Sequence, residues 1–226
     1  MKDNSMTTAY SFYIFDLDGT LLSTLGDLAA STNHALRAHH LPERSIEEVR
    51  QFVGNGVKKL IERAVPSGTD DQLRESVFCS FRAHYLAHSL DTTEPYPEVL
   101  VTLRCLKERG AKIGVVSNKL QAGVTDLCQH FFKGLVDVAI GEREGIRRKP
   151  SPDMVVEAMR QLGAQEDNTV YIGDSDVDIE TAKNSHLPCI SVEWGFRNHD
   201  FLLEHGATRL IAHCKELLEE PGGACE

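Results

Sequence analysis

The chain has 226 residues, of which 41% are hydrophobic and 26% are charged, and its formal net charge is −10. This composition is typical of a soluble globular protein, and the acidic balance argues against general binding of nucleic acids or anionic membranes, which need basic surface. No apolar run approaches the roughly 20 residues of a membrane span, and the N-terminal residues lack the apolar core of a signal peptide. Because the six cysteines are scattered, we expect a cytoplasmic protein with reduced thiols.

The predicted elements begin with a short apolar strand, Phe12–Phe15, which runs directly into Asp16. From about residue 22 to residue 94 no strand is predicted, and helical patterns follow one another instead. These patterns cover Gly26–His40, Ser45–Phe52, Gly56–Val65 and Thr69–Ser89. The second and the fourth begin with the spacing of a capping box, at Ser45 and at Thr69.

Beyond this stretch, strand and helix patterns alternate. Strands are predicted at Lys112–Ser117, Val136–Ile140, Thr169–Ile172, Pro188–Val192 and, from a weaker pattern, Thr208–Ile211. Helices are predicted at 97–110 and 151–163, because both begin near a proline and end at a glycine, and Ser151 is expected to cap the second. Such alternation implies right-handed crossovers and a parallel sheet.

The fold class is therefore predicted as α/β, with a doubly wound, Rossmann-like parallel sheet and a helical unit inserted after the first strand. We expect residues 1–21 and 96–226 to form the catalytic core and residues 22–95 to form a small α-helical cap domain. The two hinges are expected near Leu22–Leu25 and Thr92–Pro95.

Polar side chains follow or end several of these strands. They are Asp16, Asp18, Ser117, Asn118, Asp174, Asp176 and Asp178. Lys149 lies in a loop just before the predicted helix at 151–163. In an open parallel sheet, ligands bind beyond the carboxyl ends of the strands, so these residues are expected to converge on one edge. Asp176 is expected to be an exposed helix cap rather than a ligand.

This set of residues suits phosphoryl transfer. Mg²⁺ prefers oxygen ligands, and Asp16 and Asp174 can supply carboxylates to it. The metal and Lys149 would neutralise a phosphate, so that a carboxylate can attack it. Asp18 lies two residues after Asp16, on the same side of an extended chain, and can protonate the leaving alcohol and then activate water.

Phosphate binding is expected from hydroxyl groups, backbone N–H groups and the lysine, at the place where charge develops in the reaction. The residues expected to bind phosphate or substrate in the core are Gly19, Thr20, Ser117, Asn118 and Lys149. A histidine pair, His84 and His88, has a spacing that can bind metal, but no third ligand accompanies it, and a helix surface is the preferred interpretation.

Four motifs together resemble those of the haloacid dehalogenase superfamily: DLDGT, the Ser-Asn pair, the lysine of KPSP, and GDSDVD. They cover nearly the whole chain and occur in the order of that superfamily. The resemblance implies Asp16 as nucleophile and Asp18 as acid/base. It also implies Mg²⁺ bound by Asp16, Asp174 and the backbone carbonyl of Asp18, with Asp178 supporting the metal site without binding the ion directly.

Within the superfamily, the segments FVGNGVKKLIERAV (52–65) and VEWGFRN (192–198) are similar to phosphoglycolate phosphatases. This resemblance implies an enzyme for a small phosphorylated metabolite, with Asn55, Lys58 and Arg63 as candidate substrate contacts in the cap. Ser23 stands at the expected core–cap hinge, where family members usually carry an acid. Monomer and homodimer both stay open.

Other functions of the same residues remain alternatives. A β-phosphoglucomutase-like sugar phosphomutase would return the phosphoryl group to its substrate, and a pyrophosphatase or nucleotidase would differ only in specificity. A phospho-accepting receiver module is disfavoured by the helical insert, since receivers are single domain-sized units. A dehalogenase is disfavoured because loss of halide from carbon needs neither a leaving-group acid nor a cation, so Asp18 and Asp174 would lack a purpose.

Overall fold

The structure is a computed structural model, and it describes residues 10–219. These residues form a six-stranded sheet in the order β5-β4-β1-β6-β7-β8, and every neighbouring pair is parallel. The strands are β1 (Phe12–Phe15), β4 (Lys112–Leu120), β5 (Val138–Glu142), β6 (Thr169–Gly173), β7 (Cys189–Val192) and β8 (Leu210–Ile211). The predicted parallel, doubly wound sheet is confirmed.

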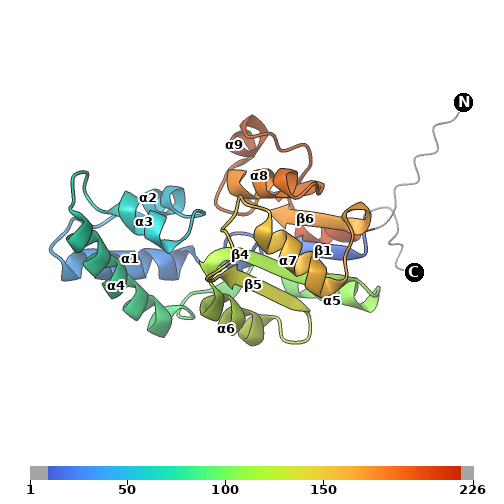
Figure 1. The fold of residues 1–226 in the computed structure, drawn as a ribbon, viewed down its shortest axis with the longest axis horizontal. Helices are drawn as coiled ribbons and strands as arrows, with labels where there is room; N and C mark the ends of the chain where they lie inside the picture. Colours follow the sequence, from blue (N-terminus) through green and yellow to red (C-terminus); the bar gives the residue numbers. More distant parts are fainter. Residues whose placement is uncertain (1–9, 220–226) are drawn as a thin grey trace, which may run out of the picture.

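Helices cover both faces of this sheet (Figure 1). They are α5 (Val99–Glu108), α6 (Gln121–Phe131), α7 (Asp153–Leu162), α8 (Asp176–Asn184), α9 (His199–Glu204) and the short 3-10 turns η1 (Glu166–Asn168) and η2 (Cys214–Leu218). Alternate residues of β1 point to opposite faces: Tyr13 and Phe15 pack in a cluster with α5 and α6, whereas Ile14 packs with α7 and α8. Both faces are therefore buried, as is usual for a parallel sheet.

Four helices lie between β2 (Leu22–Ser23) and β3 (Glu94–Pro95), a stretch that the structure describes throughout. They are α1 (Leu25–Ala38), α2 (Ile46–Phe52), α3 (Val57–Ala64) and α4 (Asp71–His88), and we call them the helical insert. The insert has its own apolar core, with Leu36 and Phe81 fully buried in it. In Figure 1 the insert lies at the left of the sheet, and β2 and β3, which pair antiparallel, connect the two parts.

The helix starts agree with the sequence only in part. Ser45 forms the predicted capping box with Glu48. The capping box at Thr69 is wrong: the side chain of Asp70 accepts from the Leu73 N–H, while the Thr69 hydroxyl donates to the Pro66 carbonyl within the preceding turn. Ser151 does not cap α7 either, since its hydroxyl donates to Asp153.

A buried carboxylate joins the two connections between sheet and insert. Asp27, near the start of α1, accepts from the backbone N–H and the hydroxyl of Thr92, at 2.9 and 2.6 Å, and from the same two groups of Thr93, at 3.0 and 2.7 Å. Asp27 is only 2% exposed. The start of the insert is thereby tied to the segment through which the chain leaves it.

Within residues 10–219, no helix is both long enough and apolar enough to cross a membrane. The cysteines in this part of the chain are free thiols, as predicted. The expectation that the N-terminus lacks a signal sequence concerns residues 1–9, which lie outside the described residues.

Candidate active site

The predicted polar residues meet at the carboxyl edge of the sheet, where the chain order of the strands reverses around β1. From β1 the sheet continues to β4 on one side and to β6 on the other. Asp16 follows β1 directly, and its N–H donates to the Ile172 carbonyl of β6 at 2.8 Å. Asp174 follows β6, whereas Ser117 lies inside β4 rather than at its end, because β4 runs on to Leu120. Such a switch point is the usual ligand site of an open α/β sheet.

Three carboxylates and one ammonium group form the centre of the site. Asp16, Asp174 and Asp178 are all buried, and their carboxylate oxygens lie within 4.8 Å of one another. The Nζ atom of Lys149 lies 2.8 Å from an oxygen of Asp16 and 2.8 Å from an oxygen of Asp178. The hydroxyl of Tyr171 donates to Asp178 at 2.9 Å. Asp178 therefore holds the lysine in place beside Asp16.

The charges of this cluster fit a divalent cation. Three carboxylates against one ammonium leave two negative charges in a buried space. Burial, and then the carboxylate of Asp178, raise the pKa of Asp174 to about 7. Burial also raises the pKa of Asp16 well above its usual range, even though Lys149 opposes this. A hard cation bound by carboxylate oxygens would reverse both shifts. The donor set of oxygen atoms is the one that Mg²⁺ prefers.

Two glycines leave the space that Asp174 occupies. A Cβ atom at Gly19 would lie 2.4 Å from an Asp174 oxygen, and a Cβ atom at Gly195 would lie 2.3 Å from the Asp174 Cβ. The hydroxyl of Thr20 donates to Asp174 at 3.1 Å, and the N–H of Phe196 donates to it at 2.7 Å. The fit of Gly195 against Asp174 was not expected from the sequence, although Gly195 lies in the segment VEWGFRN (192–198) that carries part of the family resemblance.

Gly19 and Thr20 were expected to bind phosphate, but the structure gives their donors other partners. The N–H of Gly19 donates to the Leu22 carbonyl at 2.9 Å within the turn, where Gly19 has a φ of +92° that favours glycine. The hydroxyl of Thr20 is directed to Asp174. In this structure the two residues shape the loop and orient Asp174, and their role in phosphate binding stays a prediction.

The side chain of Asn118 connects three segments of the site. It accepts from the N–H of Lys149 at 2.8 Å and donates to the Lys149 carbonyl and the Gly54 carbonyl, both at 3.1 Å. Gly54 belongs to the loop between α2 and α3 of the helical insert. Asn118 therefore positions Lys149 and holds this loop over the sheet edge. Ser117 and Asn118 line a pocket at the sheet edge together with Asp16, Asp18 and Lys149, and the contact of Ser117 with phosphate stays a prediction.

Asp18 has a partner that sequence reasoning missed. The Nζ atom of Lys119 lies 3.0 and 3.2 Å from the two carboxylate oxygens of Asp18, and it donates to the hydroxyl of Tyr85 on α4 at 2.7 Å. Burial opposes the charge of this ammonium, but Asp18 and Tyr85 outweigh burial and raise the pKa of Lys119. The sequence held a signal for this partner, because Lys119 directly follows Ser117 and Asn118 and continues the buried strand to which they belong.

The cap residues proposed as substrate contacts are not the ones that line the pocket. Arg63 donates to the Phe52 carbonyl and to the Asn55 side chain, so these two hold the loop between α2 and α3. Lys58 is exposed, and its ammonium lies over the ring of Phe78, 5.5 Å from the ring centroid. Lys58 and Phe78, which belongs to α4, line a separate surface pocket. Asn55, Lys58 and Arg63 thus lie outside the lining of this pocket, and their contact with a substrate stays a prediction.

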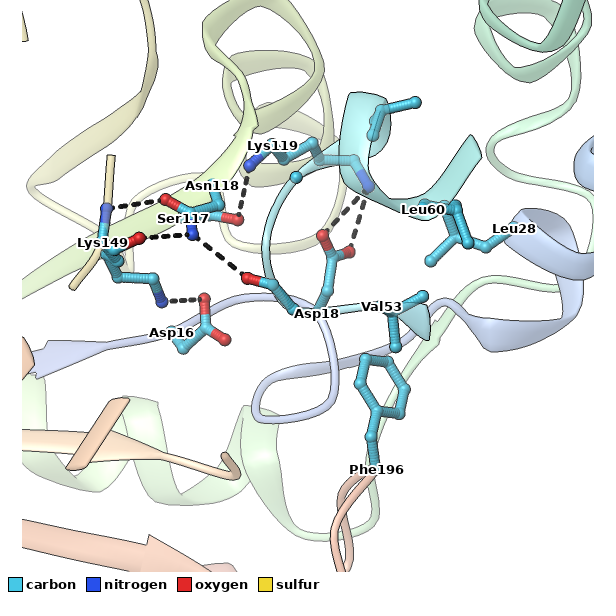
Figure 2. A pocket seen from close by; sticks show the side chains of 13 residues that line it. Asp16, Asp18, Leu28, Val53, Leu60, Ser117, Asn118, Lys119, Lys149 and Phe196 are labelled. Carbon is cyan, nitrogen blue, oxygen red and sulfur yellow. Dashed lines mark hydrogen bonds and ion pairs between the residues drawn. The ribbon is translucent and has the colours of Figure 1, made fainter. Parts of the chain in front are cut away.

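The insert contributes an apolar wall to the pocket instead (Figure 2). Its lining side chains are Leu28, Val53, Val57 and Leu60, and Phe196 of the core lies beside them. Arg197 fastens the same loop to the core, because its guanidinium donates to the carbonyls of Arg50 and Val53 at 2.8 and 3.1 Å. A ligand at Asp16 would thus lie between the sheet edge and the insert.

Comparison with known proteins agrees with this fold and site. The family model described as haloacid dehalogenase-like hydrolase matches residues 13–192. A phosphoglycolate phosphatase of Aquifex aeolicus is 34% identical over 186 residues, which are 81% of this chain and 84% of that protein. Phosphoglycolate phosphatase 1 of Pseudomonas aeruginosa is 30% identical over 211 residues, which are 91% of this chain and 77% of that protein.

A solved structure shows the same similarity. The crystal structure of a candidate phosphoglycolate phosphatase from Lactobacillus delbrueckii subsp. bulgaricus matches with a TM-score of 0.89 and 35% identity, covering 95% of this chain and 99% of that one. Fold and site thus define an α/β enzyme with an acidic centre, whose carboxylates could hold a cation, at the edge of a parallel sheet. The chain belongs to the haloacid dehalogenase-like hydrolase family, and it is a phosphatase enzyme.

Proposed function

We propose that the chain is a Mg²⁺-dependent phosphatase that hydrolyses a small phosphomonoester through an aspartyl phosphate on Asp16, with phosphoglycolate as the first candidate substrate. The observation that carries this proposal is the cluster of Asp16, Asp174 and Lys149, with Asp18 beside it. Two relatives that are phosphoglycolate phosphatases support the choice of substrate.

The chemistry follows from the positions of the two aspartates that bracket Leu17. A carboxylate oxygen of Asp16 attacks phosphorus, the bond from phosphorus to the leaving oxygen breaks, and Asp18 donates a proton to that oxygen. Asp18 then takes a proton from water, whose oxygen attacks phosphorus, and phosphate leaves with Asp16 regenerated. Lys149 lies against Asp16 and neutralises charge on the transferred group.

Mg²⁺ would be held by Asp16, Asp174 and the backbone carbonyl of Asp18. When bound, it supplies positive charge next to the phosphate. Asp178 would then support the site through Lys149, to which it is bonded. In the same proposal, residues 1–21 and 96–226 are the catalytic core and residues 22–95 are a cap whose closure excludes water from the site. A cytoplasmic location and a monomeric or dimeric state stay predictions.

Release of free phosphate tests the proposal. The purified chain is expected to release phosphate from phosphoglycolate when Mg²⁺ is present, and EDTA is expected to abolish this activity. Asp16→Asn should be inactive, whereas the matched control Asp176→Asn, a partly exposed acid next to the site, should keep most of the activity. An active Asp16→Asn variant contradicts the mechanism, and conversion of a sugar phosphate without phosphate release indicates a mutase.

A further inference from the structure

A second lysine is buried in the pocket on the side of Asp18. Lys119 is 7% exposed and lies near the end of β4, two residues after Ser117. Figure 2 shows its ammonium beside the carboxylate of Asp18, while the ammonium of Lys149 lies beside Asp16. The two lysines thus serve different ends of any ligand that reaches from Asp16 past Asp18.

The remaining surroundings of Asp18 are mostly apolar. Among the described residues that line the pocket, Lys119 and Lys149 are the only cations, and the insert adds the apolar side chains of Val53, Val57 and Leu60. Lys149 is already bonded to Asp16 and Asp178, where the phosphate would bind. Lys119, which is bonded to Asp18, is therefore the cation on the side of the leaving group.

An ammonium in such a place favours a further anion. It has three N–H donors, and in the part of the chain that is described they face the two carboxylate oxygens of Asp18, at 3.0 and 3.2 Å, and the hydroxyl of Tyr85, at 2.7 Å. A ligand anion would take over one of the two donors that face Asp18. A buried charge costs free energy unless it is well paired, and attraction between charges is stronger beside an apolar wall than in water.

We propose, building on the proposed function, that Lys119 is a specificity-determining residue whose ammonium binds an anionic group, such as a carboxylate, on the leaving group of a small phosphomonoester. Asp18 serves the leaving oxygen, and Lys119 lies 3.0 Å from Asp18, so a charge within a few bonds of that oxygen comes within its reach. Tyr85, from α4 of the insert, holds the ammonium from the other side. The anion site is thus complete only when the insert lies against the sheet.

Three substrates that differ in the charge of the leaving group test this assignment on the unaltered enzyme. They are phosphoglycolate, ethyl phosphate and phosphoethanolamine, whose leaving groups are anionic, neutral and cationic and have the same number of carbons. The expected order of kcat/KM, from phosphate release with Mg²⁺, is phosphoglycolate, then ethyl phosphate, then phosphoethanolamine. An order that does not favour the anionic leaving group overturns the assignment. Absence of phosphate release from every ester contradicts the proposed function instead.

Variants separate substrate binding from the positioning of Asp18. Lys119→Met should lower the preference for phosphoglycolate over ethyl phosphate by about 10- to 100-fold, the value of a hydrogen bond to a charged group. Lys119→Arg should keep most of the preference. An equal loss on both substrates would show that Lys119 only positions Asp18, and it overturns the assignment.

Lys58→Met is the matched control, because this lysine is exposed and faces a different pocket. The ratio of the two substrates should be unchanged in this variant, and a changed ratio counts against a specific role of Lys119. If Lys119→Met does not fold, as judged by circular dichroism, the substrate order of the unaltered enzyme and the ratio in Lys119→Arg decide the question.

Discussion

Replacement of Asp27 by asparagine should weaken the connection between the sheet and the helical insert. Asp27 accepts four hydrogen bonds of 2.6–3.0 Å, two on each carboxylate oxygen. An asparagine has only one oxygen that can accept hydrogen bonds. Its NH₂ group must therefore face the two donors of either Thr92 or Thr93, and the two bonds from that threonine cannot form. Water can reach Thr92, which is exposed, but Thr93 is only 6% exposed, so the variant should turn its oxygen towards Thr93.

The expected loss follows from the bonds that cannot form. Hydrogen bonds to charged groups are worth roughly 1.5–3 kcal/mol each, and partial exposure of the lost pair reduces their value, so the free energy of unfolding should fall by about 2–3 kcal/mol. For a chain of this length, such a loss corresponds to a fall in Tm of roughly 4–12 °C. Thermal unfolding followed by circular dichroism measures it.

Asp91→Asn provides the matched control for this experiment. Asp91 is an exposed acid next to Thr92 and is bonded to the exposed His88 at 2.8 Å, so its loss should change the free energy of unfolding by less than about 0.5 kcal/mol. If Asp27→Asn melts within the error of Asp91→Asn, Asp27 does not tie the two connections together and the reasoning is refuted.

Three further changes are expected to act on the site, on its closure and on the insert. Gly195→Ala places a Cβ atom 2.3 Å from the Cβ atom of Asp174 and should displace this carboxylate. We expect kcat/KM to fall by about 100-fold and the Mg²⁺ concentration for half-maximal phosphate release to rise. An unchanged Mg²⁺ dependence would contradict the role of Gly195. Arg197→Met removes the bond to the Val53 carbonyl and should raise KM about 5-fold with little change in Tm, which steady-state kinetics and melting can check. Burial, and then the neighbouring histidines, lower the pKa of His84 from 6.5. Because the unfolded chain then binds the proton more readily than the folded one, the free energy of unfolding should fall as the pH drops below about 6.5. His84→Gln should flatten this dependence of Tm on pH, and an unchanged slope would show that another group causes it.

The cluster of Asp16, Asp174 and Lys149 could be predicted from the sequence because its residues follow from local patterns. Asp16 and Asp174 come directly after apolar strands, and parallel strands place their carboxyl ends at one edge. Lys149 precedes a helix whose start was visible as a proline-containing turn. Each of these positions depends on one strand or one helix and on the order of the elements.

The residues that were missed depend on contacts between distant segments. The bond between Lys119 and Asp18 joins positions that are 101 residues apart, and the bonds of Asp27 join positions that are 65 and 66 residues apart. No periodicity within a single element reveals such pairs. The position of Lys58 outside the pocket lining could not be predicted for a related reason, because the pattern of α3 shows which residues are polar but not which side of the helix faces the sheet.

The covalent intermediate on Asp16 is the central claim, and chemical trapping tests it most directly. The enzyme is mixed with phosphoglycolate and Mg²⁺, quenched during turnover, reduced with borohydride and digested for mass spectrometry. An aspartyl phosphate is reduced to homoserine, so the account predicts homoserine at position 16 only when substrate is present, and none at Asp18 or Asp174. Full turnover without any modification of Asp16, or with modification at another carboxylate, would contradict the account.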